Sequence, residues 1–380
     1  MKKILHLIES KNFMKVSKYL LLKLALLFFL FPSFLAAQEE KPKLTGSVVK
    51  GIVEQFVSMH YSQKPLDDEV STKIFELFLN RLDPSHYYFL QDDVAEFRKF
   101  ETRVDDMLRR GNANLALDIF ERFKKRLSER LAMMEEFVGE DFDFSRDANW
   151  ILERADQPYP ETTAEARVIW RTKIKFDLLT LKLGDTSLKE GKERLMKRVR
   201  GLWKDFSQYE NDDVVSMYLN SMAAAYDPHS SYLAAQDLKN FDISIKLSLE
   251  GIGALLQADG EYVKVSSLVP GGPAERAGVL EPADRIIAVG QEEGEMVNVV
   301  GMRLDNVVDL IRGPKGSVVR LDVVPAQAVD MTRSQIVEIT RDTVSLEDQA
   351  ADSEVIEVKR DGAPHRIGVI NVPTFYVDFD

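Results

Sequence analysis

Two glycines flank one aliphatic residue in the run Glu250-Gly251-Ile252-Gly253-Ala254, and this run is the strongest constraint on the fold. Glycines leave backbone N–H groups unshielded by side chains, so these groups can turn toward an anion. The C-terminal carboxylate of a peptide is such an anion, and the strand-like residues after the run could pair with the rest of that peptide. Because a Gly-x-Gly alone is more often an ordinary turn or bulge, the prediction needs support from the sequence around it.

The sequence after this run resembles a PDZ domain. A turn, a strand, a groove helix and a second turn occur in the order of that domain, at residues 270–278, 284–290, 305–313 and 313–317. We therefore expect a PDZ domain, a β-sandwich-like fold with helices, at residues 239–328.

The PDZ resemblance implies a binding site for the free end of a peptide. Four loop residues would bind the carboxylate through backbone N–H groups: Gly251, Ile252, Gly253 and Ala254. Four apolar residues of the groove helix lie at helical spacing and would partly contact the terminal side chain: Leu304, Val307, Val308 and Ile311. Such a stripe is mostly core under any interpretation.

The N-terminus predicts export. Five lysines precede an apolar run at residues 19–31 that is broken only by Lys23, and residues 32–37 end in two alanines. This run is short for a membrane span, so we expect residues 1–37 to be a cleaved signal peptide rather than an anchor. Met14 would give a signal peptide of more ordinary length, so both Met1 and Met14 stay open as the start.

Composition agrees with an exported protein of several domains. The net charge is −12, and it becomes −17 without residues 1–37, which hold six lysines and one glutamate. Nucleic acids and anionic membrane surfaces are not attracted to such a charge. The chain has no cysteine, so disulfides are excluded, and its five histidines show no metal-ligand spacing, so we expect neither a metal nor another cofactor.

Residues 38–238 are expected to form a helical domain. Apolar residues recur at three- and four-residue steps through this region, and Gly or Pro separates the repeats. The expected helices lie at residues 48–61, 70–82, 91–109, 112–138, 161–183, 187–205 and 211–225.

Two similar segments, Asp83-Pro84-Ser85-His86 and Asp227-Pro228-His229-Ser230, interrupt this helical pattern. In each, Asp-Pro should stop a helix, and the next residues could pack back on its end. The second segment holds Asp, His and Ser together, but members of a catalytic triad meet in space and rarely lie side by side in sequence. We therefore interpret both segments as helix ends rather than as catalytic sites.

Together these segments resemble the tail-specific proteases, also called carboxy-terminal processing peptidases, of the bacterial periplasm. The resemblance covers nearly all of the chain after residue 37. The segments that carry it, besides the signal sequence, are Leu82-Asp83-Pro84, Tyr226-Asp227-Pro228-His229-Ser230-Ser231-Tyr232, Glu250-Gly251-Ile252-Gly253-Ala254, Gly271-Gly272-Pro273-Ala274, Gly313-Pro314-Lys315-Gly316-Ser317 and Val369-Ile370-Asn371-Val372-Pro373-Thr374-Phe375-Tyr376-Val377.

The resemblance implies a serine endopeptidase with a Ser-Lys dyad, located in the periplasm of a Gram-negative bacterium. It implies a multidomain α+β protein that binds apolar C-terminal tails of periplasmic proteins through its PDZ domain and cleaves upstream of them. It also allows a lipoprotein adaptor as a partner and loose association with the inner membrane, without implying either.

The catalytic Ser and Lys are expected beyond Asp380, with none in this chain. Ser230, Ser266 and Ser317 lack a lysine in an acyl-transfer motif, and we interpret Lys315 as an exposed turn residue. Residues 329–380 would be the incomplete start of an α/β protease core, in which residues 366–377 form a strand with no partner strand. The chain should then bind tails without cleaving them. Two other functions stay open: a non-enzymatic periplasmic PDZ adaptor, and a chaperone-like helical protein with an incidental PDZ domain.

Overall fold

The computed structural model describes residues 43–146, 149–328, 333–346, 351–360, 363–373 and 375. The expected signal peptide and both candidate start residues lie outside the described residues. The described residues after Lys43 belong to one compact unit. In that part of the chain, no helix is both long enough and apolar enough to cross a bilayer.

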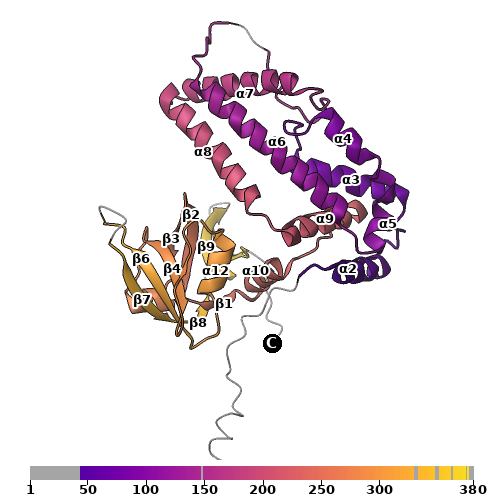
Figure 1. Cartoon of the computed structure of the whole chain (residues 1–380). Helices are drawn as coiled ribbons and strands as arrows, with labels where there is room; N and C mark the ends of the chain where they lie inside the picture. Colours follow the sequence, from indigo (N-terminus) through magenta and orange to yellow (C-terminus); the bar gives the residue numbers. More distant parts are fainter. Residues whose placement is uncertain are drawn as a thin grey trace, which may run out of the picture. The chain divides into compact units, whose positions relative to one another are not determined.

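The first part of the chain is a bundle of helices, which confirms the helical pattern (Figure 1). Its helices are α2 (Gly46–Met59), α3 (Asp68–Leu82), α4 (Gln91–Arg98), η1 (Glu101–Arg103), α5 (Val104–Arg109), α6 (Asn114–Gly139), α7 (Thr163–Leu183), α8 (Leu188–Ser207) and α9 (Asn211–Tyr226). The expected helix at residues 91–109 is divided into α4, η1 and α5. The division falls at a tight turn, where the Phe100 N–H donates to the Phe97 carbonyl.

Two apolar cores hold these helices together. The larger core lies among α2, α3, α5, α6 and α9 and contains buried residues such as Phe75, Phe78 and Phe120. The smaller core joins the second half of α6 to α7 and α8 through Trp170 and Ile174. Side-chain caps begin several of the helices, as where the Asp67 carboxylate accepts the Val70 N–H.

A helix that the sequence pattern did not reveal, α10 (Ala235–Lys246), leads into the β-rich part. It ends at Leu247, which adopts a left-handed conformation with φ 51°. None of its residues is buried, so the spacing of its apolar residues carried little signal.

The β-rich part has the fold of a PDZ domain. Its elements are β1 (Ser248–Gly251), β2 (Ala254–Asp259), β3 (Tyr262–Leu268), α11 (Pro273–Ala277), β4 (Arg285–Gln291), β5 (Val297–Asn298), α12 (Leu304–Ile311), β6 (Val318–Val324), β7 (Gln335–Thr340) and β8 (Asp342–Ser345). One sheet has the order β2-β3-β4-β6-β7 with β5 beside β4, and a second small sheet pairs β1 with β8. The core between them contains Ile252, Val265, Val307 and Leu321.

Strands β7 and β8 come after residue 328, where we expected the PDZ domain to end. Strand β7 pairs with β6 in the main sheet, and β8 pairs with β1. Between them lies the buried Arg341, whose guanidinium donates to the carbonyls of Leu310 and Ile311 at the end of α12. The boundary at residue 329 stays a prediction, but strands on both sides of it share these sheets.

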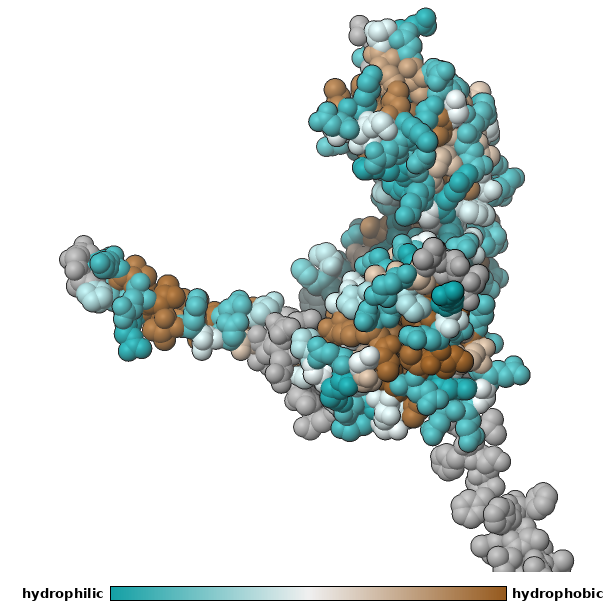
Figure 2. Space-filling model, turned by 90° about the vertical axis from the view of Figure 1, so that its left-hand side faces the viewer, coloured by the Kyte–Doolittle hydropathy of each residue, from teal (hydrophilic) through white to brown (hydrophobic). Residues whose placement is uncertain are grey.

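The expectation that residues 366–377 lack a partner strand is wrong. Strand β10 (Ala363–Asn371) pairs antiparallel with β9 (Asp352–Arg360) as a two-stranded hairpin. The partner strand was missed because β9 mixes charged and apolar residues without strict alternation, so it lacks the period-two pattern of a half-buried strand. Val355, Ile370 and Phe375 are exposed, and in Figure 2 brown apolar atoms lie between teal polar ones along this hairpin.

Candidate peptide-binding site

The loop between β1 and β2 is shaped by Gly253. This residue has φ +69°, a conformation that disfavours any side chain. An added Cβ would also lie 3.1 Å from Gly272 Cα and 3.3 Å from Pro273 Cδ. The loop can therefore pack against the start of α11 only if this position is glycine.

The loop is held by its carbonyls and its one apolar side chain. Ala274 N–H donates to the Ile252 carbonyl at 2.8 Å, and Val269 N–H donates to the Gly253 carbonyl at 2.9 Å. The Ile252 side chain is buried in the core. Among the described residues, nothing accepts a hydrogen bond from the N–H of Ile252 or Gly253. These two donors are free to bind an anion.

The N–H of Ala254 is a third free donor, and the geometry of the sheet shows why. In an antiparallel pair, hydrogen-bonded and non-bonded residue pairs alternate. Since Gly253 is bonded to Val269, the next residue, Ala254, faces Leu268 as a non-bonded pair. Its N–H therefore points away from β3. Gly251, in contrast, lies in β1 opposite Asp342, so its backbone takes part in the β1–β8 pair, and its expected role in binding a carboxylate stays a prediction.

Strand β2 is an edge strand of the main sheet. Helix α12 lies beside it and contacts both β2 and β4. Among the described strands, none pairs with the outer edge of β2, so its backbone groups can pair with an added strand. A peptide paired with β2 would thus lie between β2 and α12, in a groove that begins at the loop amides.

The four expected pocket residues of α12 divide into two pairs. Val307 and Ile311 are buried and belong to the core, which leaves them little surface for a ligand. Leu304 and Val308 are half-buried and can contact a bound side chain. Strand β2 adds Leu256, a half-buried residue that was not among the expected pocket residues.

Arg312, at the end of α12, was missed as well. Its Cγ lies 3.9 Å from the position of an added Cβ on Gly251, so its stem passes beside the loop. Its guanidinium donates to Asn240 of α10 at 2.8 Å. Burial lowers the pKa of Arg312, and the nearby Asp309 partly offsets this shift. A bound carboxylate would be a favourable neighbour for this cation. Only the fold could reveal this residue, because α10 and the loop are distant from it in sequence.

The second Asp-Pro segment meets a histidine from the end of α2. His60 Nε2 lies 3.1 Å from both Asp227 Oδ2 and Ser230 Oγ. The Ser62 N–H donates to His60 Nδ1, so the proton of the neutral ring is on Nε2, which cannot then accept the proton of Ser230. The Ser230 hydroxyl donates to Asp227 instead. The cluster therefore closes the end of α9 and does not have the geometry of a catalytic triad.

The first Asp-Pro segment also ends a helix, as expected. The buried Asp83 carboxylate accepts the N–H groups of Tyr87, Tyr88 and Phe89. Arg130 and Trp170 donate to the carbonyls of this loop from the other side. Burial raises the pKa of Asp83, and the three backbone donors partly offset that rise.

The other candidate groups are structural. Lys315 is exposed in its turn and lies 2.8 Å from Asp342. The Ser317 hydroxyl donates to the Pro314 carbonyl. Within the described ranges, no group of three or more acidic or histidine side chains could hold a metal ion.

The glycine loop, the open strand edge and the amphipathic helix define a PDZ domain joined to a helical domain. Comparison with known proteins agrees: residues 242–324 match the PDZ domain family, and residues 52–236 match the tail specific protease N-terminal domain. The chain is 38% identical over 329 residues to the tail-specific protease of Haemophilus influenzae, across 86% of this chain and 46% of that protein. The chain belongs to the tail-specific protease family.

Two further comparisons cover smaller shares of the chain. The carboxy-terminal processing protease CtpA of Bacillus subtilis is 36% identical over 41% of this chain and 32% of that protein. A solved PDZ domain of a carboxy-terminal protease from Vibrio cholerae, in complex with peptide, is 54% identical over 26% of this chain and all of that chain, with a TM-score of 0.25. The chain spans about half the length of the Haemophilus relative, and less of the Bacillus one.

Proposed function

We propose that this chain is the substrate-recognition portion of a periplasmic serine endopeptidase that binds apolar C-terminal tails. The observation that carries the proposal is the set of free loop amides, on Ile252, Gly253 and Ala254, at the start of an open strand edge. Three neighbouring free N–H groups favour a carboxylate over a neutral group. The adjoining groove is apolar through Leu256, Leu304 and Val308, which favours an apolar terminal residue.

The hydrolytic step is proposed to use a serine and a lysine beyond Asp380. The serine hydroxyl would attack the scissile carbonyl while a lysine kept neutral by burial accepts its proton. The family supports this assignment, together with the structural roles of Ser230, Ser317 and Lys315 within the described residues. The proposal that the protein is exported to the periplasm is based on the lysines and the apolar run of residues 1–37.

Tail binding is tested with a fluorescent peptide that ends in apolar residues, as the free acid and as the amide. We expect the acid to bind at least about tenfold more tightly, because the amide loses the charge that the loop amides recognise. Equal affinity for the two forms would contradict the assignment of the carboxylate loop.

A matched pair of variants locates the site. Gly253→Ala should abolish binding, because its Cβ would crowd Gly272 at φ +69°. Gly316→Ala changes a glycine at φ +85° with no atom within 4 Å of the new Cβ, so it controls for backbone strain alone. Gly253→Pro should be at least as severe, since proline fixes φ near −65° and removes a donor. Normal binding by Gly253→Ala would contradict the assignment of this loop as the tail-binding site.

A further inference from the structure

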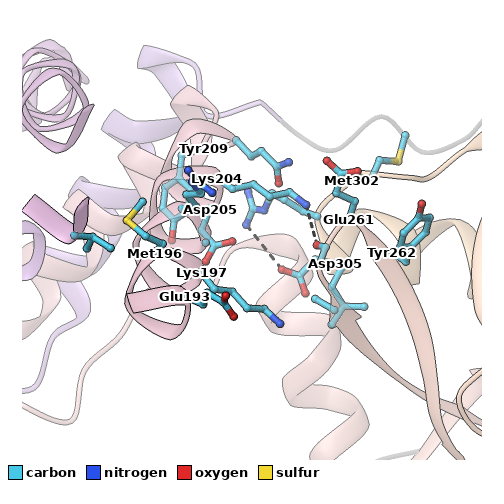
Figure 3. A pocket seen from close by; sticks show the side chains of 18 of the residues that line it. Glu193, Met196, Lys197, Lys204, Asp205, Tyr209, Glu261, Tyr262, Met302 and Asp305 are labelled. Carbon is cyan, nitrogen blue, oxygen red and sulfur yellow. Dashed lines mark hydrogen bonds and ion pairs between the residues drawn. The ribbon is translucent and has the colours of Figure 1, made fainter. Parts of the chain in front are cut away.

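A cavity of about 1000 Å³ lies between α8 and the loops beside β2 and α12. Met196, Lys197 and Gly201 line it from α8, and Ala258, Tyr262 and Leu304 line it from the PDZ domain. In Figure 3 the side chains of Glu193, Met196 and Lys197 lie on one side, and those of Tyr262, Met302 and Asp305 lie on the other.

The cavity continues the peptide groove. Ala258 belongs to β2 and Leu304 is the first residue of α12, so the groove ends where the cavity begins. A tail whose carboxylate lies at Gly253 must run antiparallel to β2, toward Ala258. At about 3.4 Å per residue, its last four or five residues fill the groove. The residues upstream of them then reach the cavity.

We propose that this cavity binds the segment of the substrate polypeptide immediately upstream of the tail, an inference that rests on the proposed tail binding. The established PDZ mode reads the last few residues of a ligand. Here α8 supplies a second wall, so the helical domain would take part in choosing the substrate.

The walls suit an extended polypeptide rather than a small anion. Apolar surface comes from residues such as Met196, Tyr262 and Leu304. Charged side chains of both signs, among them Glu193, Lys197, Arg200 and Glu261, also line it. Within the described ranges, the side chains of Glu193 and Lys197 form no ion pair or hydrogen bond, although they lie four residues apart on one helix. They are free to bind the backbone or polar side chains of a guest. The cavity volume is at the upper end of ordinary ligand pockets, with room for several residues.

The walls are also fixed to each other before any ligand binds. Lys204 donates to the Gly260 carbonyl at 3.1 Å, and Gln208 donates to the Gly301 carbonyl at 2.7 Å. The guanidinium of Arg303 pairs with Asp213 at 2.6 Å. Because the cavity is preformed, an upstream segment can bind without the cost of ordering its walls.

The test compares two peptides with the same apolar tail, one of about five residues that fills only the groove and one of about twelve. We expect the longer peptide to bind the chain about tenfold more tightly. Equal affinity would overturn the inference and leave the proposed function standing. If neither peptide bound, both would be overturned.

Gly201 offers a variant that fills the cavity. An added Cβ at Gly201 has no atom within 4 Å, so Gly201→Trp can extend into open space. It should reduce binding of the longer peptide to the level of the short one and leave the short peptide unchanged, which also shows that the domain is folded. Gly201→Ala, which fills little space, and Gly51→Trp, at another open helical glycine on α2, should bind both peptides normally. If Gly201→Trp bound the longer peptide as tightly as the unchanged chain does, the assignment of the upstream segment to this cavity would be overturned.

Discussion

The Asp227 carboxylate is held by groups from two distant parts of the chain. It accepts the Ser230 hydroxyl and the His229 N–H from its own loop, and it faces His60 from the end of α2. The hydrogen bond from Ser230, and after it the one from His229, lowers the pKa of Asp227 to about 2. The fold thus favours the ionised form of this carboxyl.

This pKa predicts how the stability of the protein depends on acid. A free Asp titrates near 3.9, so the stabilisation from Asp227 is complete above about pH 4 and is lost as the pH falls toward 2. Asp227→Asn cannot ionise, and its free energy of unfolding should fall less steeply over this range. Urea unfolding at a series of pH values measures the slope. Asp118→Asn, at an exposed position on α6, is the control. An unchanged slope for Asp227→Asn would contradict the assigned role.

Helices α9 and α12 are both held at their C-terminal ends by Lys or Arg side chains from other parts of the chain. Lys64 and Lys73 donate to the carbonyls of Tyr226 and Ala225 at the end of α9. Arg341 does the same for α12, where it also donates to Ser317 and Gln291. Positive groups at this end are favourable because the last carbonyls lack helical partners and carry the negative end of the helix dipole.

Arg341 is therefore expected to position the groove helix. Arg341→Met keeps most of the apolar stem but leaves the carbonyls of Leu310 and Ile311 without this donor. Hydrogen bonds to a charged group contribute about 1.5–3 kcal/mol, so we expect a loss of at least about 2 kcal/mol in the free energy of unfolding. Tail binding should weaken as well. Arg320→Met, at a half-buried arginine on β6, is the control, and equal losses in the two variants would argue against a special role for Arg341.

Elements with a strong repeat were predictable, and those set by long-range pairing were not. Helices α6 to α9 lie close to their expected bounds because their apolar residues recur every three or four positions and a cap or glycine ends them. Helix α10 was missed because it buries no residue. Pairing of β8 with β1 joins residues nearly a hundred positions apart, which no local pattern reveals.

The whole chain has a candidate recognition site, and the hydroxyls of two of its candidate serines, Ser230 and Ser317, form hydrogen bonds that hold loops. We expect the chain to cleave no fluorogenic peptide that ends in apolar residues, even at concentrations where the peptide is bound. Turnover by the purified chain that serine-directed reagents abolish would contradict this prediction. Equal turnover by Gly253→Ala, prepared in the same way, would instead indicate a contaminating protease.

The proposed protease and the alternative adaptor differ in the gene sequence beyond the codon for Asp380. A reading frame that continues and encodes a serine and a lysine would support the protease. A stop codon directly after Asp380 would support the adaptor. Tail binding is common to both functions, so the loop variants test the recognition site independently of this choice.

Residue patterns alone predicted the family, the succession of a helical and a PDZ domain, and the loop that would bind a tail. These come from local signals: periodic apolar residues, Asp-Pro stops and glycines at positions that side chains cannot occupy. The packing of the elements was needed to show that Val307 and Ile311 are core, that Arg312 lies beside the loop and that α8 lines a cavity next to β2 and α12. Those facts depend on contacts between residues far apart in the chain, because burial and proximity arise only when the elements pack.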